Sequence, residues 1–267
     1  MAFSYDNFII DRALGGSMFS PANGDLLWTI DQIENPDMKC TSTTDEVTDA
    51  LGSTIAIFNR AKKAEFTGTN SLFNLGLAAG QFGATKNIAS AGNTIVTPKI
   101  EYFTTTTGQT TIVLAQIPVG VTGAEIKSIN GISGTAFNST KYSVAAAASA
   151  TEFKLDAATK TITLPTGLAV GTKIFVKYNY ASQTTTEIAN NATEFPTAGE
   201  FIMQVIGHLG CDKATVYVAN VVMPNAELKS EVDLKFESKG KHPFTIEAMQ
   251  DFCDSNKQLF RIDIDAN

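Results

Sequence analysis

Apolar and polar residues alternate with a period of two along much of the chain. The alternation over residues 231–237 and again over 244–248 predicts two half-buried antiparallel strands that form a hairpin or lie close together. Residues 201–208 and 215–223 predict two further strands, and Ile262 with Ile264 indicates a short last one. The C-terminal third is therefore expected to be antiparallel β structure.

The first third follows the same pattern, with one long interruption. Residues 26–33 and 53–66 are strand candidates. Between them, residues 36–52 are rich in Thr, Asp and Glu, and this length exceeds the roughly 4–6 residues of an ordinary connection. The polar stretch is either a pair of strand extensions or a projecting arm.

One segment has the composition of a helix instead of a strand. Residues 70–82 are rich in Leu and Ala, and Thr69 or Asn70 can cap their N-terminus. Gly83 suits the C-terminal stop. We expect this to be the one clear helix.

The middle of the chain differs in composition and charge. Residues 96–182 are rich in Thr, Ala, Gly and Ser, and they hold seven Lys against four acidic residues, a net charge of +3. The remaining residues therefore carry −10 of the total of −7. Such a change of sign supports a separate module.

Short strands are expected within this module. Residues 110–117 and 124–129 are candidates, and residues 162–164 are expected to pair with 174–180 across a Gly- and Pro-containing turn. Strands of this length and spacing predict a small Ig-like β-sandwich. Tyr178 and Tyr180 are more readily assigned to its core than to a sugar-binding platform.

Overall charge and cysteine content limit the function classes. The 267 residues include 20 Lys and Arg against 27 Asp and Glu, which disfavours tight binding of nucleic acid through overall charge. No secretory signal and no apolar run of membrane-spanning length is visible. The three widely spaced cysteines form neither a zinc pattern nor a disulfide framework, which predicts free thiols and a reducing cytoplasm: Cys40, Cys211 and Cys253.

Residues that carry chemistry are few. The only histidines are His208 and His242, and neither has further ligands at metal spacing. Serine-hydrolase elbows, HExxH and phosphate-binding loops are absent from the sequence. We therefore predict no catalytic, cofactor or metal site, and a protein that is not an enzyme.

The order of elements resembles a known family. A strand over residues 26–33, the polar connection 35–52, the return strand 53–66 and the segment 67–73 leading into the helix resemble the N-terminal half of the tail tube proteins (major tail proteins) of tailed bacteriophages. Residues 199–264 are similar to the strands that close the sandwich in that family. The module at 96–182 looks like the small β-domains inserted in phage tail proteins.

The resemblance implies a fold and a role. The fold is a mainly β, tail-tube-like antiparallel β-sandwich or barrel with one flanking helix, formed by residues 1–95 and 183–267, with the inserted β-domain 96–182 on its outer surface. The implied role is a structural virion protein that forms hexameric rings, stacked into the tail tube through which DNA leaves. The implied partners are further copies of the chain and other tail proteins, namely baseplate or tip, terminator and sheath. DNA would pass without sequence-specific binding, no membrane would be involved, and assembly would take place in the host cytoplasm.

The resemblance also indicates contact residues. In the family the long connection touches an adjacent ring or subunit, which corresponds here to Asp37, Asp45, Glu46, Val47, Thr48 and Asp49. The N-terminal segment carries a large apolar load and either packs on its own core or forms an arm between subunits, with these candidate residues: Phe3, Tyr5, Phe8 and Ile9.

Two other readings stay open. A tail terminator, baseplate hub component or decoration protein would share this β construction and form closed rings that never elongate. A carbohydrate-binding β-module would need an exposed aromatic platform.

Overall fold

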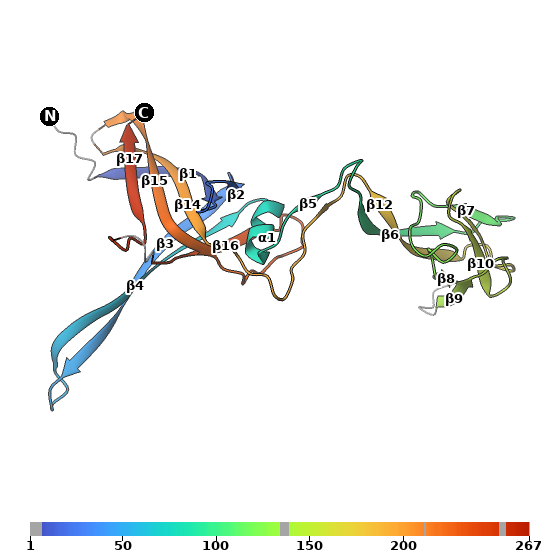
Figure 1. Cartoon of the computed structure of the whole chain (residues 1–267), viewed down its shortest axis with the longest axis horizontal. Helices are drawn as coiled ribbons and strands as arrows, with labels where there is room; N and C mark the ends of the chain where they lie inside the picture. The colour runs from blue at the N-terminus through green and yellow to red at the C-terminus, as the bar shows by residue number, and fades with distance from the viewer. Residues whose placement is uncertain (1–6, 134–138, 211, 251–254, 267) are drawn as a thin grey trace. The chain divides into compact units, whose positions relative to one another are not determined.

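The computed structural model describes residues 7–133, 139–210, 212–250 and 255–266. The chain is mainly β and divides into two compact units (Figure 1). The first unit comprises residues 1–86 and 188–267, and the second comprises residues 87–187.

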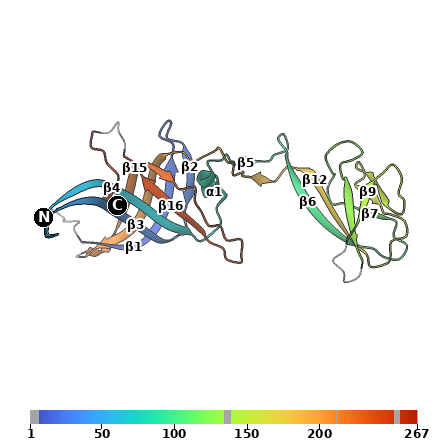
Figure 2. The same ribbon diagram turned by 90° about the horizontal axis from the view of Figure 1, so that it is seen from below.

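An eight-stranded sheet, curved into half a barrel, forms the first unit (Figures 1 and 2). Its order is β2-β1-β14-β15-β16-β4-β3, and β17 also pairs with β15. Every strand pair in this sheet is antiparallel. The strands are β1 (Phe8–Phe19), β2 (Leu26–Ile30), β3 (Ile33–Thr48), β4 (Thr54–Asn70), β14 (Gly199–Leu209), β15 (Asp212–Leu228), β16 (His242–Ala248) and β17 (Arg261–Ala266).

Alternation along these strands places one face of the sheet in the core. In β14 and β16 every second side chain is buried, as their sequences predict. Four aromatic rings form the centre, with neighbouring centroids 5.4–6.4 Å apart: Trp28, Phe66, Phe201 and Phe244. Burial of one such side chain contributes about 1.5–3 kcal/mol, so this cluster is a main source of the unit's stability. The predicted strands at 201–208, 215–223, 244–248 and 262–264 are confirmed.

The strand predicted at residues 231–237 is wrong. β15 ends at Leu228, and residues 231–236 form no strand. β15 pairs with β16 only over residues 226–228, so the expected hairpin of 231–237 with 244–248 is not formed. An alternating sequence forms a strand only where a partner strand is available, and residues 231–237 pair with no strand of the described chain. Phe236, which was expected on a buried face, is 87% exposed.

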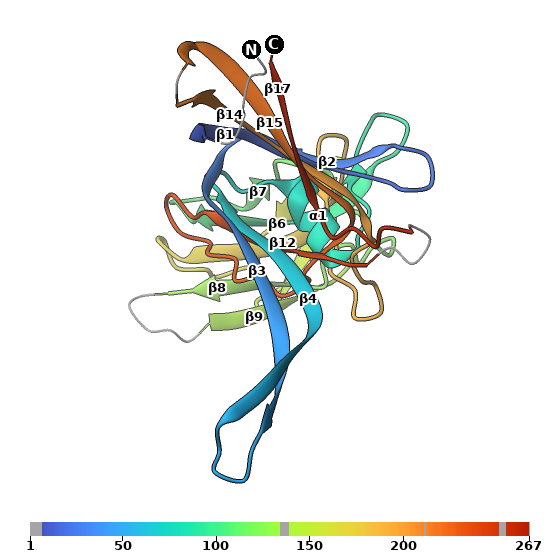
Figure 3. The same cartoon turned by 90° about the vertical axis from the view of Figure 1, so that its left-hand side faces the viewer.

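The polar stretch at 36–52 forms strand extensions, one of the two alternatives. Thr-rich sequence has high β propensity, and β3 and β4 pair as a hairpin of 16 and 17 residues. Only the inner part of β4, from Ala64 to Asn70, also pairs with β16. Residues 41–63 therefore extend beyond the sheet as a two-stranded ribbon, called the projecting ribbon below (Figure 3).

The single helix of the described chain is α1 (Leu75–Phe82). Asn74 caps it by accepting a hydrogen bond from the Leu77 N–H, whereas the predicted caps Thr69 and Asn70 are wrong because β4 continues through them. Gly83 ends the helix in the left-handed conformation, as predicted. None of the helices in the described residues has the length and apolar character needed to cross a membrane.

The second unit is a seven-stranded sheet of order β6-β12-β8-β9-β10-β11-β7 (Figure 1). Six of these strands place buried side chains in one core, and β6 packs the partly buried Phe103 against it. A separate pair, β5 with β13, lies where the chain enters and leaves the unit. The strands are β5 (Asn87–Ile88), β6 (Ile95–Thr104), β7 (Thr111–Val113), β8 (Ser128–Ile132), β9 (Ser139–Val144), β10 (Glu152–Asp156), β11 (Thr161–Thr163), β12 (Lys173–Ser182) and β13 (Thr186–Glu187).

Pairing in this unit differs from the prediction in one respect. β11 does not pair with β12; it pairs with β10 and β7, while β12 lies between β6 and β8. The intervening segment 164–172 therefore links two distant positions in the sheet order instead of forming a hairpin turn. The predictions at 162–164 and 174–180 match β11 and β12, and 110–117 contains the shorter β7. The prediction at 124–129 overlaps β8 only at residues 128–129, and β6, β9 and β10 were not predicted.

Replacing Gly83 with Ala should destabilise the first unit more than replacing Gly24. Both residues have positive φ, 65° and 74°, a conformation that costs an L-residue about 1–2 kcal/mol. A Cβ on Gly83 would also lie 2.1 Å from the Phe195 carbonyl oxygen, whereas one on Gly24 meets nothing within 4 Å. Urea unfolding of both variants measures the difference, and equal losses would show that the Phe195 segment moves aside freely.

Candidate assembly surfaces

The projecting ribbon is the most exposed part of the described first unit. Every residue from 41 to 63 is exposed except Ala56, which is half-buried. Five large apolar side chains lie there at 45–93% exposure: Val47, Leu51, Ile55, Ile57 and Phe58. Because neighbouring positions of a strand point to opposite faces, these side chains occupy both faces of the ribbon. No sheet of the described chain covers either face.

Local interactions fix the shape of the ribbon. The Arg60 guanidinium donates to the Asp45 carboxylate at 2.7 Å, and the Arg60 side chain lies over the Phe58 ring. At the tip, the Asp49 carboxylate accepts hydrogen bonds from the N–H groups of Leu51 and Ser53 at 2.9 and 2.8 Å. An isolated two-stranded hairpin is only marginally stable in water, so these contacts alone provide little stability. Contact with another molecule would add the burial that the ribbon lacks.

The predicted contact residues fall in two places. Asp45, Glu46, Val47 and Thr48 lie in the ribbon on β3, and Asp49 forms the turn. Asp37 lies apart from them, near the base of β3 opposite Thr67. Whether these residues form a contact stays a prediction.

The return strand of the ribbon was predicted at residues 53–66, but the exposure of its apolar side chains was not. Ile55, Ile57 and Phe58 carry its largest exposed apolar side chains, but they were assigned only to an ordinary strand. Within the segment, these apolar residues have the same local pattern as those of a buried strand.

The N-terminal segment joins the sheet where it is described. Phe8 and Ile9 belong to β1 and pair with Leu209 and His208 of β14. Phe8 packs against the core, whereas Ile9 is 53% exposed. The other two candidates of the N-terminal arm, Phe3 and Tyr5, lie outside the described residues.

Three strands of the first unit have an open edge. β2 and β3 end the sheet order, and β17 pairs only with β15 among the described strands. Unpaired N–H and C=O groups along such edges are a template for pairing with another chain.

A second exposed apolar surface lies beside the start of α1. We call it the apolar patch, and it comprises Leu72, Phe73, Leu75 and Phe236, at 37–87% exposure. The Phe73 ring contacts Phe236 at a centroid distance of 6.0 Å and stacks on His242 at 5.1 Å. The patch therefore joins the α1 region to the connection between β15 and β16.

The buried His242 side chain holds Phe73 and the start of α1 in place. Its ring is fully buried, its Nδ1 accepts from the Asn74 N–H at 3.3 Å, and its Nε2 lies 2.6 Å from the Gln81 Oε1. Since Nδ1 is the acceptor, the proton is on Nε2 and is donated to Gln81. Gln81 in turn donates to the Pro243 carbonyl oxygen at 3.0 Å, so α1 is tied to β16 by a neutral polar network.

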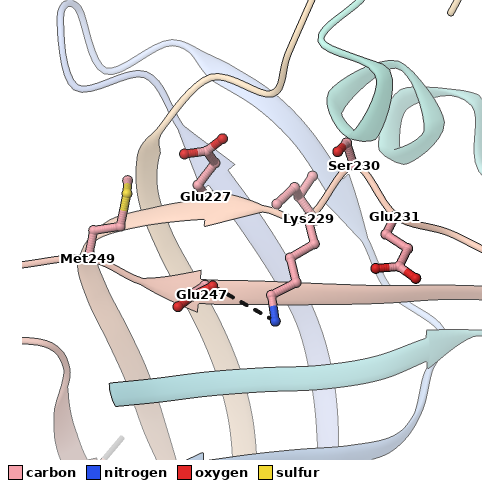
Figure 4. A pocket seen from close by; sticks show the side chains of 7 residues that line it. Glu227, Lys229, Ser230, Glu231, Glu247 and Met249 are labelled. Atoms are coloured by element: carbon pink, nitrogen blue, oxygen red, sulfur yellow. Dashed lines mark ion pairs between the residues drawn. The ribbon is translucent and has the colours of Figure 1, made fainter. Parts of the chain in front are cut away.

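Charged side chains gather on the face of the first unit's sheet that points away from its core (Figure 4). Glu227, Glu247 and Glu65 are lateral neighbours on β15, β16 and β4. The Lys229 ammonium lies 2.9 Å from Glu65 and 3.8 Å from Glu247. The hydrogen bond with Glu65 raises the pKa of Lys229, so this amine stays protonated and is a poor base or nucleophile.

The remaining acidic and histidine side chains give no metal centre. Within the described residues no group of three or more His, Cys, Asp or Glu side chains is arranged to hold a metal ion.

The tyrosines of the second unit are not a sugar platform. Tyr178 is buried, and burial together with its hydrogen bond to Glu101 raises the pKa of its hydroxyl well above the ordinary value. Tyr180 packs against the same core. Among the described residues of this unit, the exposed aromatic is instead Tyr102, which meets Phe175 edge to face at 72°, so the two rings form no common flat surface.

A mainly β subunit with open strand edges and an uncovered ribbon has the features of a structural protein. A family model described as the YomU/Tube protein family matches residues 9–262. The chain therefore belongs to the YomU/Tube protein family, which confirms the resemblance to phage tail tube proteins and implies a structural component of the virion tail. No curated protein matches the chain.

Acid should destabilise the first unit through His242. Burial lowers the pKa of His242 from 6.5 to about 4, so the unfolded chain takes up this proton at higher pH than the folded one. Stability should therefore fall as pH drops from about 6.5 to about 4, by about 3 kcal/mol, and then level off. Urea unfolding between these pH values checks this, with His242→Asn as the variant whose side chain cannot titrate. The same pH dependence in wild type and variant would contradict the assignment.

Proposed function

We propose that the protein self-assembles into hexameric rings, which stack into the tail tube that conducts DNA into the host cell during ejection. The observation that carries this proposal is the projecting ribbon, whose apolar side chains are exposed on both faces. Apolar surface of this extent on a narrow ribbon is favourable only when a partner covers it.

The type of contact supports a repeating assembly. A ribbon of one copy that meets a different surface of the next copy makes a heterologous contact, and such contacts generate rings or open filaments. The open edges of β2, β3 and β17 supply a second route of association by strand pairing within a ring. The ribbon contact and the open strand edges together are what a subunit needs to form a ring and to stack that ring on another.

Charge supports a channel through which DNA slides. The residues outside 96–182 carry a net charge of −10, and the row of Glu65, Glu247 and Glu227 concentrates carboxylates on one sheet face. An acidic wall repels phosphate and prevents adhesion, the reverse of a DNA-binding surface. DNA would then pass without sequence-specific contacts.

The second unit is assigned to the outer surface of the tube. Its core shares no residue with the core of the first unit, and its residues 96–182 carry +3. The partners of the assembled tube would be other tail proteins at its two ends and, in a contractile tail, a sheath. Assembly would take place in the host cytoplasm.

Negative-stain electron microscopy over a concentration series tests the proposal. Hollow tubes of uniform width, or six-fold rings, are expected. Closed rings that never elongate would favour a terminator, hub or decoration protein, and a dispersed monomer would direct attention to a carbohydrate-binding module, to be tested by a glycan screen.

Removing apolar side chains from the ribbon should block assembly without unfolding the subunit. Ile55 and Ile57 are 67% and 57% exposed, so the double variant Ile55→Ser/Ile57→Ser should keep its unfolding free energy within about 0.5 kcal/mol. Tube length and yield should fall sharply, as measured by sedimentation and microscopy. Val113→Ser, at an equally exposed site of the second unit, is the matched control and should assemble normally. Normal tubes from the double variant would rule out the ribbon as a contact.

Deletion of the second unit should leave folding and assembly intact. Residues 89–185 can be replaced by a short Gly-Ser linker, because β5 and β13 pair with each other at its base. Circular dichroism and microscopy of the shortened protein would test this. Failure of the shortened chain to fold would show that the second unit is integral to the subunit.

A further inference from the structure

We infer that the free edge of β17 in one copy pairs with the free edge of β1 in the next copy, and that Arg12 and Asp265 form an ion pair across this contact. The inference rests on the proposed function, since it names the surfaces through which neighbouring subunits of a ring would join. Both strands belong to the first unit.

The two free edges bound a four-stranded part of the sheet, β1-β14-β15-β17 (Figure 1). On one side, β2 pairs with β1 only over residues 16–19, so no described strand pairs with the outer edge of β1 over residues 8–14. On the other side, β17 pairs with β15 and with no further strand of the described chain. Each edge therefore presents a row of backbone N–H and C=O groups to another chain.

Strand direction favours β1 as the partner of β17. Each strand in the series β1, β14, β15 and β17 is antiparallel to the one before it, so β17 runs opposite to β1. Copies that repeat side by side around a ring keep this direction, so β17 of one copy meets β1 of the next in antiparallel pairing. The open edges of β2 and β3 run in the same direction as β17 within the sheet and would pair with it in parallel, which is slightly less stable per residue.

Apolar side chains lie on the core face of the sheet at both edges. Ala13 of β1 and Ile264 of β17 both pack against the core. Ile262 shares a face with Ile264, because successive side chains of a strand alternate, and it is 57% exposed. Ile10 lies opposite the buried Gly207 and is 64% exposed. A neighbouring copy that continues the sheet would cover exposed apolar surface and extend the core across the contact.

On the other face, the two edges carry charges of opposite sign. Ile206 of β14 lies opposite Arg12 on one side and opposite Val218 on the other. Asp265 lies opposite Val218, so Arg12 and Asp265 occupy the two ends of one lateral row. Three strand spacings of about 4.8 Å separate them by roughly 14 Å, which is too far for an ion pair within one subunit. Between neighbouring copies, the two ends of the row meet.

The register that sets Asp265 opposite Arg12 satisfies both faces at once. It also sets Ile264 opposite Ala13, and opposite residues of an antiparallel pair share a face. It pairs residues of β1 that β2 leaves free. A slip by one residue would turn Asp265 toward the core face, so the burial of that face selects the register.

The remaining charges of the two strands leave this pair free to form. Neither Arg12 nor Asp265 has an ion-pair partner among the described residues. Asp263 is paired with Arg261 of its own strand at 2.9 Å. Asp11 is the bulged residue of β1 and has no partner on β14. An exposed ion pair adds little affinity, but it contributes to the choice of partner and register.

A double-cysteine variant tests the contact. In a chain whose three cysteines are replaced by serine, Arg12→Cys and Asp265→Cys are combined, and the assembled protein is oxidised. A ladder of disulfide-linked chains on a non-reducing gel is expected, because directly opposite residues of a strand pair are close enough for a disulfide. Arg12→Cys alone and Asp265→Cys alone are the matched controls and should give single chains. A linked dimer from either single variant would show pairing of like edges and would overturn the inference.

Exchange of the two charges gives an independent readout. Arg12→Asp alone and Asp265→Arg alone should each reduce the yield of rings several-fold, and the combined variant should recover most of the loss. Asp11→Asn, at the neighbouring exposed site, is the matched control and should not lower the yield. All three sites are exposed, so unchanged urea midpoints of the free subunits would exclude misfolding as the cause.

The outcomes separate the two proposals. Rings or tubes of the double-cysteine variant without a disulfide ladder, or losses that add in the charge-exchanged variant, would overturn this inference while leaving the proposed function intact. Wild-type protein that forms neither rings nor tubes under any condition would overturn the proposed function, and this inference with it.

Discussion

The pairing of β3 with β4 is the constraint on which the rest of the first unit depends. Its inner part provides Phe66 to the aromatic core and hydrogen-bonds to β16, which fixes that edge of the sheet. Its outer part continues the same ladder beyond the point where any other described strand accompanies it. The β3–β4 hairpin is therefore fixed in the core at its inner end and carries an uncovered surface at its outer end. This combination suits a component of a larger assembly.

The opposite end of β4 is fixed by polar instead of apolar contacts. Asn70 pairs with His242, and the neutral His242 ring connects to Asn74 and Gln81. These bonds tie α1 to the sheet, so the positions of the tip and of the apolar patch are set by one continuous strand. A buried neutral network of this kind is stable only while His242 is uncharged, since a protonated Nδ1 would face the Asn74 N–H that it now accepts.

Sequence patterns predicted the strands well where a buried face imposed alternation, as in β14 and β16. They failed where alternation occurred without a partner. Residues 231–237 have the pattern of a strand, but pairing depends on which edges are free in three dimensions, and this is not encoded within the segment. The same limit explains why β11 was assigned the wrong neighbour. For the candidate surfaces, the acidic residues on β3 and the turn were predicted from the resemblance. Ile55, Ile57 and Phe236 were not, because an exposed apolar residue has the same local signature as a buried one.

The composition of the ribbon reconciles solubility with association. Its apolar residues are interspersed with Asp45, Glu46 and Asp49, and like charges on copies that meet tip to tip repel each other. This repulsion opposes pairing of two ribbons, which open strand edges would otherwise favour. A surface of another copy that lacks this acidic charge would escape the repulsion, so the acidic residues that keep free subunits apart favour contact of the ribbon with a different surface.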